Sequence, residues 1–201
     1  MIGLANSDKP AVSIIILAGG HSRRMGSDKA QVRVNDERLI DMCIREVQAI
    51  GYEPIVVSGA DLTLPHHIRQ VSEYPAFGGP VAGIAAGVDS LSCTSGYIGI
   101  VAVDAPLSPK ECPQLVSVLN NNPDVDVAYG LYKGHIQPLL TVWKNAALRR
   151  CLAAFDSPRD QAAKALLRTP SLCSLEVPVG IATRDYDTPA ELQELGSISL
   201  Q

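Results

Sequence analysis

Residues 18–30, Ala-Gly-Gly-His-Ser-Arg-Arg-Met-Gly-Ser-Asp-Lys-Ala, decide the fold, because they follow directly on the apolar run 11–17. Within that run, the β-branched stretch 12–16 is too short and too rich in isoleucine for a helix. Such a stretch is typical of a central strand that is buried on both faces. We expect the strand to end at Gly19 and Gly20, where glycine permits a left-handed backbone and close approach of a ligand. Successive N–H groups in such a turn form a concavity that binds anions.

The loop after these glycines is basic in a chain whose net charge is −4. It carries His21, Arg23, Arg24 and Lys29. Arginine can grip phosphate oxygens in a bidentate manner and lysine acts as a point charge, so the loop predicts a phosphate-rich ligand. An exposed, solvated basic turn is the simpler alternative. The spacing matches neither a P-loop nor a dinucleotide-binding fingerprint, which indicates a third kind of phosphate loop.

Length and composition predict one domain over residues 11–201, preceded by a flexible tail at 1–10. A chain of 201 residues with 46% hydrophobic content can bury one substantial core, whereas two domains would be cramped. The acidic balance provides no global basic field, so we expect no nucleic-acid partner. No apolar run reaches the length of a membrane span and no signal segment opens the chain, so we expect a cytoplasmic protein without membrane contact.

The five cysteines predict reduced, mostly buried thiols. Their number is odd, they are widely spaced and they form no C-x-x-C pair, which argues against disulfides and zinc. They are Cys43, Cys93, Cys112, Cys151 and Cys173.

Strand-like and helix-like segments alternate along the chain, which predicts an α/β fold. Expected strands after the first are 54–58, 68–71, 97–103, 125–129, a segment within 130–143, and 173–177. Expected helices are 39–50, ended by Gly51, then 80–91, a segment around 115–119 capped by Ser108, 146–155, 160–167, and a last helix after Thr188 and Pro189. This order indicates a three-layer αβα sandwich around a mostly parallel, Rossmann-like sheet.

Several residues outside the first loop are candidates for a site. Gly79 and Pro80 open a helix of small residues, and a ligand could approach its N-terminus. Asp104 ends a buried strand, where open α/β sheets place their ligands. Magnesium ligation and capping of the next helix are both open for Asp104, and the neighbouring phosphate loop favours magnesium. Arg159, near a helix start, could face the same site.

Three other positions have a structural interpretation. Pro138 within a strand pattern indicates a sheet edge or the entrance of a strand. The adjacent His66 and His67 point in different directions on either a helix or a strand, so we expect a surface pair and no metal site. Trp143 is expected to pack in the core.

The first loop resembles a known nucleotide-binding signature. The residues Leu17-Ala18-Gly19-Gly20-x-Ser22-x-Arg24-Met25-Gly26-x-Asp28-Lys29 are similar to those of the MobA-like nucleotidyltransferases, the molybdenum cofactor guanylyltransferases. Supporting motifs follow in the same order as in that family, and the resemblance covers residues 12–195. They are Gly79-Pro80-Val81-Ala82-Gly83, Val103-Asp104-Ala105-Pro106-Leu107, Gln137-Pro138-Leu139 and Asp187-Thr188-Pro189-x-Glu191-Leu192.

The resemblance implies the nucleotide-diphospho-sugar transferase type of fold and transfer of a nucleoside monophosphate, foremost GMP from GTP, to the phosphate of molybdopterin with release of pyrophosphate. It implies that Arg24, Lys29 and Asp104 are catalytic. It implies nucleotide binding by Leu17, Ala18, Gly19, Gly20, Ser22, Arg24 and Lys29, with Glu73 the nearest candidate for reading the base. It implies acceptor contacts from Gly79, Pro80, Gly83, Gln137 and Arg159, and Mg²⁺ ligation by Asp104 and Asp187.

The implied chemistry needs alignment and charge neutralisation more than covalent participation of the protein. A phosphate-monoester acceptor is already largely ionised at neutral pH, because its second pKa is about 6. No protein general base is then required. The acceptor phosphate attacks the α-phosphorus in line, and Lys29 and Arg24 stabilise the developing charge.

Two departures from the family pattern leave the base and the acceptor open. The family commonly has Asn-x-Asn-Thr-Pro where this chain has Asp185-Tyr186-Asp187-Thr188-Pro189. The added negative charge is expected to alter the choice of acceptor. The segment before the second glycine loop also departs from the pattern: Glu73 is only the nearest candidate for the carboxylate that reads guanine, which leaves the base open. CTP in place of GTP, another phosphorylated acceptor, and a non-catalytic nucleotide-binding regulator are the alternatives. For partners we expect GTP or CTP and a phosphorylated pterin-type acceptor, with a monomeric protein that contacts molybdoenzyme maturation proteins transiently.

Overall fold

The computed structural model describes residues 10–19, 28–92 and 96–199. Gly20, Ser22 and Arg24 of the first loop, Cys93 and nearly all of the expected 1–10 tail lie outside these described residues. The elements in chain order are β1 (Val12–Leu17), η1 (Lys29–Gln31), β2 (Arg33–Val34), β3 (Glu37–Arg38), α1 (Leu39–Ala49), β4 (Glu53–Val57), β5 (Arg69–Val71), α2 (Pro80–Asp89), β6 (Tyr97–Ala102), η2 (Ser108–Glu111), α3 (Cys112–Asn121), β7 (Val127–Tyr132), β8 (His135–Lys144), α4 (Asn145–Ala153), η3 (Ala163–Arg168), β9 (Ser174–Pro178), η4 (Ile181–Thr183), α5 (Pro189–Leu192) and β10 (Ile198–Ser199).

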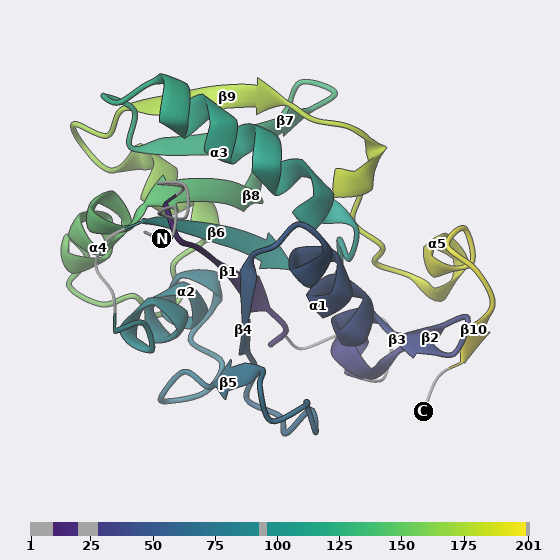
Figure 1. Ribbon diagram of the computed structural model, residues 1–201. Coiled ribbons are helices and arrows are strands. Elements are labelled where there is room, and N and C mark those ends of the chain that lie inside the picture. Colours follow the sequence, from purple (N-terminus) through teal and green to yellow (C-terminus); the bar gives the residue numbers. More distant parts are fainter. Residues whose placement is uncertain (1–9, 20–27, 93–95, 200–201) are drawn as a thin grey trace, which may run out of the picture.

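A seven-stranded sheet in the order β5-β4-β1-β6-β8-β7-β9 forms the middle layer (Figure 1). β4, β1 and β6 are mutually parallel, and β5 extends the parallel set. β8 runs antiparallel to both β6 and β7, and β9 pairs with β7 in parallel. The prediction of a mostly parallel sheet is confirmed. A separate three-stranded sheet, β10-β2-β3, lies beside the large one.

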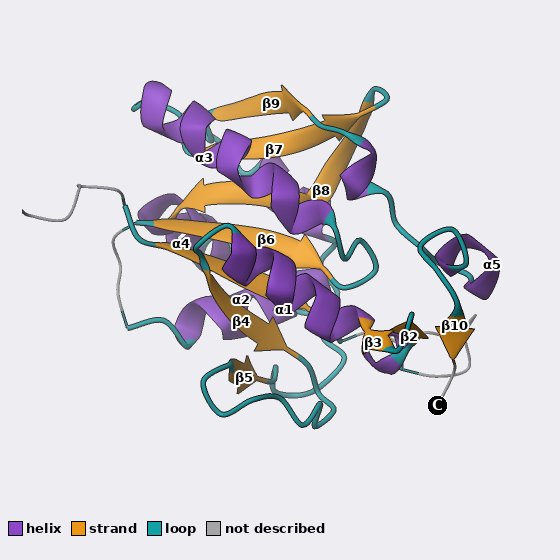
Figure 2. Ribbon diagram, turned by 45° about the vertical axis from the view of Figure 1, so that its right-hand side comes forward, coloured by secondary structure: helices purple, strands orange, loops and turns teal. Residues whose placement is uncertain are grey.

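Helices cover both faces of the large sheet, which gives the predicted three layers (Figure 2). Because side chains alternate along a strand, β1 contributes to two cores at once. Ile14 and Ile16 belong to the core formed with α1 and α3, whereas Ile15 belongs to the core formed with α2 and α4. All three isoleucines are fully buried. The run that predicted a strand buried on both faces therefore forms one, and Trp143 packs in the second core as expected.

Two predicted helix boundaries are confirmed by their capping geometry. Gly51 follows α1 with φ +78°, a left-handed conformation that glycine adopts without strain. Thr188 caps α5 and forms a capping box with Glu191: its side chain accepts from the Glu191 backbone N–H, and Glu191 accepts from the Thr188 backbone. This box fixes the chain directly after Asp187, which places that carboxylate.

The structure corrects several local predictions. The segment predicted as a helix at 160–167 forms the 3₁₀ helix η3, and β10 follows the strand that was expected to be the last. Ser108 makes no capping hydrogen bond and is buried. β8 lies inside the sheet, so Pro138 does not mark a sheet edge. The proline is tolerated because β6 pairs only with residues 141–144 of β8, and because the pairing with β7 shifts register between Tyr129 and Gly130.

The thiol predictions hold for the described cysteines. Cys43, Cys112 and Cys151 are buried, Cys173 is exposed, and all four are free. His66 and His67 are both exposed, as expected. Within the described residues, none of the helices has the length and apolar character needed to cross a bilayer.

Candidate functional site

A cavity of about 650 Å³ lies at the carboxyl edge of the large sheet. Its walls come from the ends of three parallel neighbours, β4, β1 and β6, together with the loop and helix start at 73–83. The carboxyl ends of parallel strands meet at one edge, which is where open α/β sheets bind ligands. Leu17, Ala18 and Gly19, predicted to contact a nucleotide, all line the cavity.

Lys29 enters the cavity from η1. The side chain of Asp28 accepts a hydrogen bond from Ala30 N at 3.1 Å and so caps this short helix. Lys29 Nζ lies 2.8 Å from Asp187 Oδ1 and 3.7 Å from Asp104 Oδ2. Its side chain is only 14% exposed, so the ammonium is held inside the site and is not a solvated surface charge.

Asp104 and Asp187 come from distant parts of the chain and meet at this lysine. Asp104 lies two residues after the end of β6, and the backbone N–H of Tyr186 donates to the Asp104 carbonyl at 2.9 Å. That bond brings residues 185–187 against the end of β6. The predicted trio of Lys29, Asp104 and Asp187 is thus assembled, with both carboxylates lining the cavity.

The carboxylates of this region are crowded. Burial raises the pKa of Asp104, the Lys29 ammonium opposes the rise and the Asp187 charge adds to it. Loss of solvation, followed by the charges of Asp104 and Asp187, raises the pKa of Asp185 to about 6. Among the residues that the structure describes, the Lys29 ammonium pairs with two carboxylates, Asp104 and Asp187, so a cation can offset the remaining negative charge there.

The donor set suits a hard divalent cation that also binds phosphates. Among the residues that the structure describes, no group of three His, Cys, Asp or Glu side chains is arranged to hold a metal alone. Mg²⁺ is usually bound by one or two carboxylates together with substrate phosphates and water, so a two-carboxylate site is what it requires. Asp104 and Asp187 therefore fit a cation that binds together with a nucleotide.

The opposite end of the cavity, beside β4, is different in character. It is lined by Glu73, Phe77 and the Ser58-Gly59 pair that follows β4. Glu73 Oε1 accepts from Gly78 N at 3.0 Å, whereas Oε2 is buried and has no hydrogen-bond partner among the residues that the structure describes. A buried carboxylate oxygen without a partner is costly, and a ligand with N–H donors would satisfy it. Phe77 is 61% exposed despite its apolar ring and lies at the cavity wall.

The predicted acceptor residues divide into two groups. Gly79, Pro80 and Gly83 line the cavity. Gln137 and Arg159 are not among the lining residues. Gln137 Nε2 donates to the His135 carbonyl at 3.3 Å.

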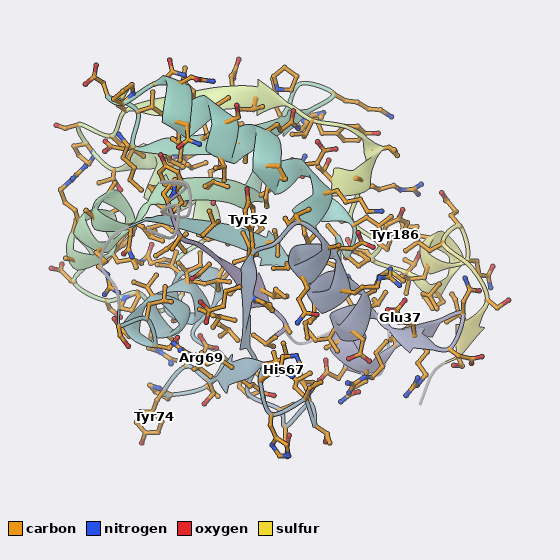
Figure 3. The ribbon with its side chains drawn as sticks, in the orientation of Figure 1. Glu37, Tyr52, His67, Arg69, Tyr74 and Tyr186 are labelled. Atoms are coloured by element: carbon orange, nitrogen blue, oxygen red, sulfur yellow. The ribbon has the colours of Figure 1, made fainter. Side chains whose placement is uncertain are left out.

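Sequence reasoning missed part of the wall. Ser58 and Gly59 carried a usable signal, because they end a predicted parallel strand as Asp104 does. Leu139 belongs to the Gln137-Pro138-Leu139 motif but was not predicted as a site residue, and Phe77 carried no signal that separates it from ordinary apolar residues. Tyr74, in the same loop as Phe77, is 99% exposed and projects away from the fold (Figure 3).

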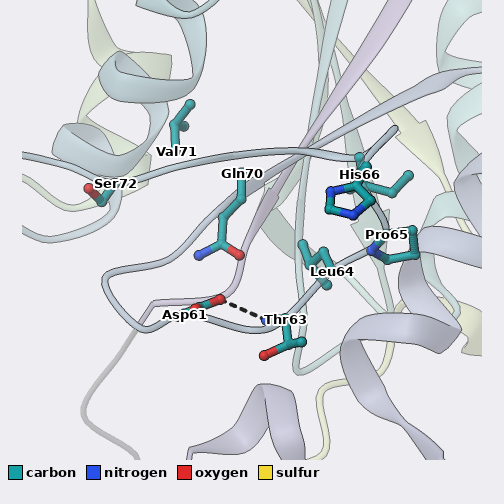
Figure 4. Close-up of a pocket in the computed structure, with 9 residues that line it drawn as sticks. Asp61, Thr63, Leu64, Pro65, His66, Gln70, Val71 and Ser72 are labelled. Atoms are coloured by element: carbon teal, nitrogen blue, oxygen red, sulfur yellow. Dashed lines mark hydrogen bonds between the residues drawn. The ribbon is translucent and has the colours of Figure 1, made fainter.

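A second, more open cavity of about 510 Å³ lies beside β5, away from these charges. Two of its polar side chains bond to nearby backbone groups: Asp61 accepts from Thr63 N at 2.9 Å (Figure 4), and Gln70 donates to the Ala60 carbonyl. No predicted site residue lines it.

The fold and the first cavity together define a Rossmann-like α/β protein with a charged cavity at the carboxyl edge of its sheet. The crystal structure of molybdopterin-guanine dinucleotide biosynthesis protein A from Archaeoglobus fulgidus has the same fold, with a TM-score of 0.67 at 19% identity over 90% of this chain and 95% of that one.

The chain belongs to the family described as the MobA-like NTP transferase domain, whose model matches residues 14–175. It is 32% identical over 139 residues to the probable molybdenum cofactor guanylyltransferases of Carboxydothermus hydrogenoformans and of Pelotomaculum thermopropionicum. Each match covers 67% of this chain. The matched part spans 66% of the first relative and 64% of the second, slightly less than two thirds of their length.

Proposed function

We propose that this protein transfers GMP from GTP to the phosphate of a molybdopterin-type acceptor and releases pyrophosphate. The observation that carries the proposal is the Lys29 ammonium held between Asp104 and Asp187 at the carboxyl edge of the sheet. The names of the relatives supply the nucleotide and the acceptor. The cavity volume of about 650 Å³ is of the size that binds a small-molecule ligand.

The cavity has two chemically distinct ends, which suggests how GTP lies in it. The β4 end offers an apolar ring and a Glu73 carboxylate oxygen that no described residue hydrogen-bonds, which can accept from the N–H donors on the edge of guanine. The β6 end offers Lys29 and the carboxylates, which suit a triphosphate with its cation. Leu17 to Gly19, at the end of the strand between them, would contact the nucleoside.

In the proposed reaction an acceptor phosphate oxygen attacks the α-phosphorus, forming one P–O bond. The P–O bond to the β-phosphate breaks, and its electron pair leaves with pyrophosphate. Lys29 would neutralise charge that develops on the phosphate oxygens, and its burial strengthens that interaction relative to water. The acceptor phosphate is ionised at neutral pH, so no side chain need remove a proton.

Asp104 and Asp187 would hold the divalent cation, and we propose Mg²⁺. The bound cation supplies charge neutralisation to the phosphate oxygens. Arg24 and Ser22, outside the described residues, are proposed as further phosphate contacts from their place in the family motif. Gly79, Pro80 and Gly83 are proposed as the acceptor side of the cavity.

A direct test incubates the purified protein with Mg²⁺, a molybdopterin-type acceptor and each of the four NTPs in turn. Mass spectrometry of the product and release of pyrophosphate are measured together. The proposal predicts a guanine dinucleotide with GTP and little product with the other three. A product with CTP alone would assign the other base, and NTP binding without pyrophosphate release would favour the non-catalytic regulator.

A further inference from the structure

The chain between α4 and η3 packs against the loop that forms the β4 end of the cavity. Arg159 Nη1 donates to the Pro75 carbonyl at 2.8 Å. Asp160 N donates to the Gly78 carbonyl at 2.6 Å. We call residues 157–161 the clamp segment and residues 73–79 the base loop. The two lie side by side, although more than 75 positions separate them in sequence.

The fit between the two segments is close. Asp160 has φ +58°, a left-handed conformation that is uncommon outside glycine and that aspartate adopts more readily than most residues. Gly78 has no room for a side chain: a Cβ there would lie 2.8 Å from Ala82 Cβ and 3.3 Å from Arg159 Nη1. Ser157 Oγ accepts from Arg159 N at 3.2 Å, which steadies the turn that carries the arginine.

The base loop has little apolar packing of its own to hold it. Tyr74 is 99% exposed and Phe77 is 61% exposed. Segments with few buried apolar contacts open at low free energy, so polar contacts decide whether such a loop is ordered. A guanidinium that donates to a carbonyl is a charge-assisted hydrogen bond, stronger than a neutral one.

We propose that Arg159 is a positioning residue that holds the base loop in place, so that Glu73 and Phe77 form the base-binding end of the cavity. The role rests on the proposed function in one respect, that the ligand is a nucleotide. It differs from the acceptor contact implied by the family resemblance. Arg159 is absent from the cavity wall and its guanidinium donates to Pro75, which favours positioning.

Positioning of the base loop by Arg159 predicts an effect on GTP binding, whereas an acceptor contact predicts an effect on the acceptor alone. Binding of GTP with Mg²⁺ is measured by titration calorimetry without any acceptor. Arg159→Ala is expected to weaken GTP binding about tenfold, the value of one charged hydrogen bond. Arg159→Lys, which can still donate one bond to the carbonyl, is expected to restore part of the loss. Arg150→Ala is the matched control: its guanidinium pairs with Asp126, just before the amino end of β7, and its GTP affinity is expected to stay unchanged.

A double-mutant comparison tests whether Arg159 acts through the base loop. If it does, Arg159→Ala adds little in a Glu73→Gln background, because the group that it positions is already impaired. Hydrogen exchange of the amides at 73–79 gives a readout without ligand, and Arg159→Ala is expected to speed exchange there and leave β7 unaffected.

Three results would overturn the positioning role. One is unchanged GTP affinity in Arg159→Ala with a raised KM for the acceptor alone. The second is an equal loss of affinity with and without Glu73→Gln. The third is unchanged exchange of the base loop. If the unmodified protein binds no NTP, the proposed function fails, and hydrogen exchange still decides whether Arg159 orders the base loop.

Discussion

The contribution of Lys29 depends on its burial and on its two carboxylate neighbours. An exposed lysine contributes little to the stability of a fold, since a surface ion pair is worth about 0–1 kcal/mol. Lys29 is instead 14% exposed and contacts one carboxylate from the end of β6 and another from the segment before α5. The same side chain therefore links two parts of the site and contributes positive charge to it.

Replacing Lys29 by methionine keeps the aliphatic stem and removes the charge. Turnover is expected to fall about 100-fold or more, as for loss of one electrostatic stabiliser of a transition state. Steady-state pyrophosphate release measures the effect, and circular dichroism checks the fold. Lys164→Met, at an exposed position on η3, is the control and should keep full activity. Activity near that of the control in Lys29→Met would refute the catalytic role.

Glu73→Gln retains the shape of the side chain and replaces an acceptor oxygen by a donor. If Glu73 reads guanine, the preference for GTP over CTP should fall roughly 10- to 100-fold, because buried donors on the base lose their partner. Competition between the two nucleotides, measured as a ratio of kcat/KM, gives this number directly. Glu176→Gln, on the exposed edge strand β9, is the charge-matched control. An unchanged ratio would remove Glu73 from base selection.

At the scale of elements, short capped segments position the chemistry as firmly as long ones. α5 spans only four residues, yet Glu191 Oε2 accepts from Asp187 N at 2.8 Å and from Thr188 N at 2.9 Å. The cap therefore fixes the backbone that carries the Asp187 carboxylate.

Thr188→Ala removes the cap hydroxyl and is expected to cost about 1 kcal/mol of stability. Turnover should also fall under conditions where the protein stays folded, because the Thr188 hydroxyl no longer orients Glu191, whose carboxylate holds the Asp187 backbone. Thr188→Ser, which keeps a capping oxygen, should retain both properties. Chemical denaturation and pyrophosphate release, measured on the same preparations, separate the two effects. Equal turnover in the Ala and Ser variants would contradict the link between cap and site.

α2 approaches β1 closely because it lacks side chains where the two meet. A Cβ on Gly87 would lie 2.8 Å from Ile15 Cδ1 and 3.0 Å from two further Ile15 carbons. The N-terminal end of the same helix supplies Pro80 and Gly83 to the cavity wall. The helix–sheet distance thus also sets the width of the cavity.

Gly87→Val is expected to destabilise the protein by about 1–3 kcal/mol through overpacking against Ile15. Ala86→Val, at a partly exposed position of the same helix, should cost only the difference in helix propensity, below about 1 kcal/mol. Urea denaturation of both variants measures the contrast. Equal stabilities would show that α2 can move away from β1 without cost.

At the scale of the whole molecule, ligand binding and stability are linked. A ligand at 100 times its Kd stabilises the folded state by about 2.7 kcal/mol. For a chain of this length that corresponds to roughly 5–10 °C in Tm. GTP with Mg²⁺ is expected to raise Tm by this amount, and EDTA should remove most of the increase. Differential scanning fluorimetry measures the shift in Tm. The variant Asp104→Asn should abolish the shift. An equal shift in the presence of EDTA would argue against a role of the cation.

The sequence predicted the layers and the edge of the sheet where the cavity lies, because both follow from local patterns. The isoleucine run specifies β1, and the rule that parallel strands present their carboxyl ends at one edge places Gly19 and Asp104 together. The sequence could not predict that Arg159 donates to Pro75 or that Gln137 lies outside the cavity wall. Both facts depend on the packing of segments that are distant in the chain. Ser108 was misjudged because its type favours a cap, while tertiary packing buries it.

The contact between Lys29 and Asp187 also has a consequence for protein synthesis. The two residues are 158 positions apart in the chain. At translation rates of about 5–20 residues per second, roughly 8 to 30 s pass between their syntheses. During that interval the amino-terminal strand and its glycine turn exist without the carboxylate that completes them. A nascent chain therefore acquires the complete charge arrangement of the site only near the end of its synthesis, and incomplete chains lack it.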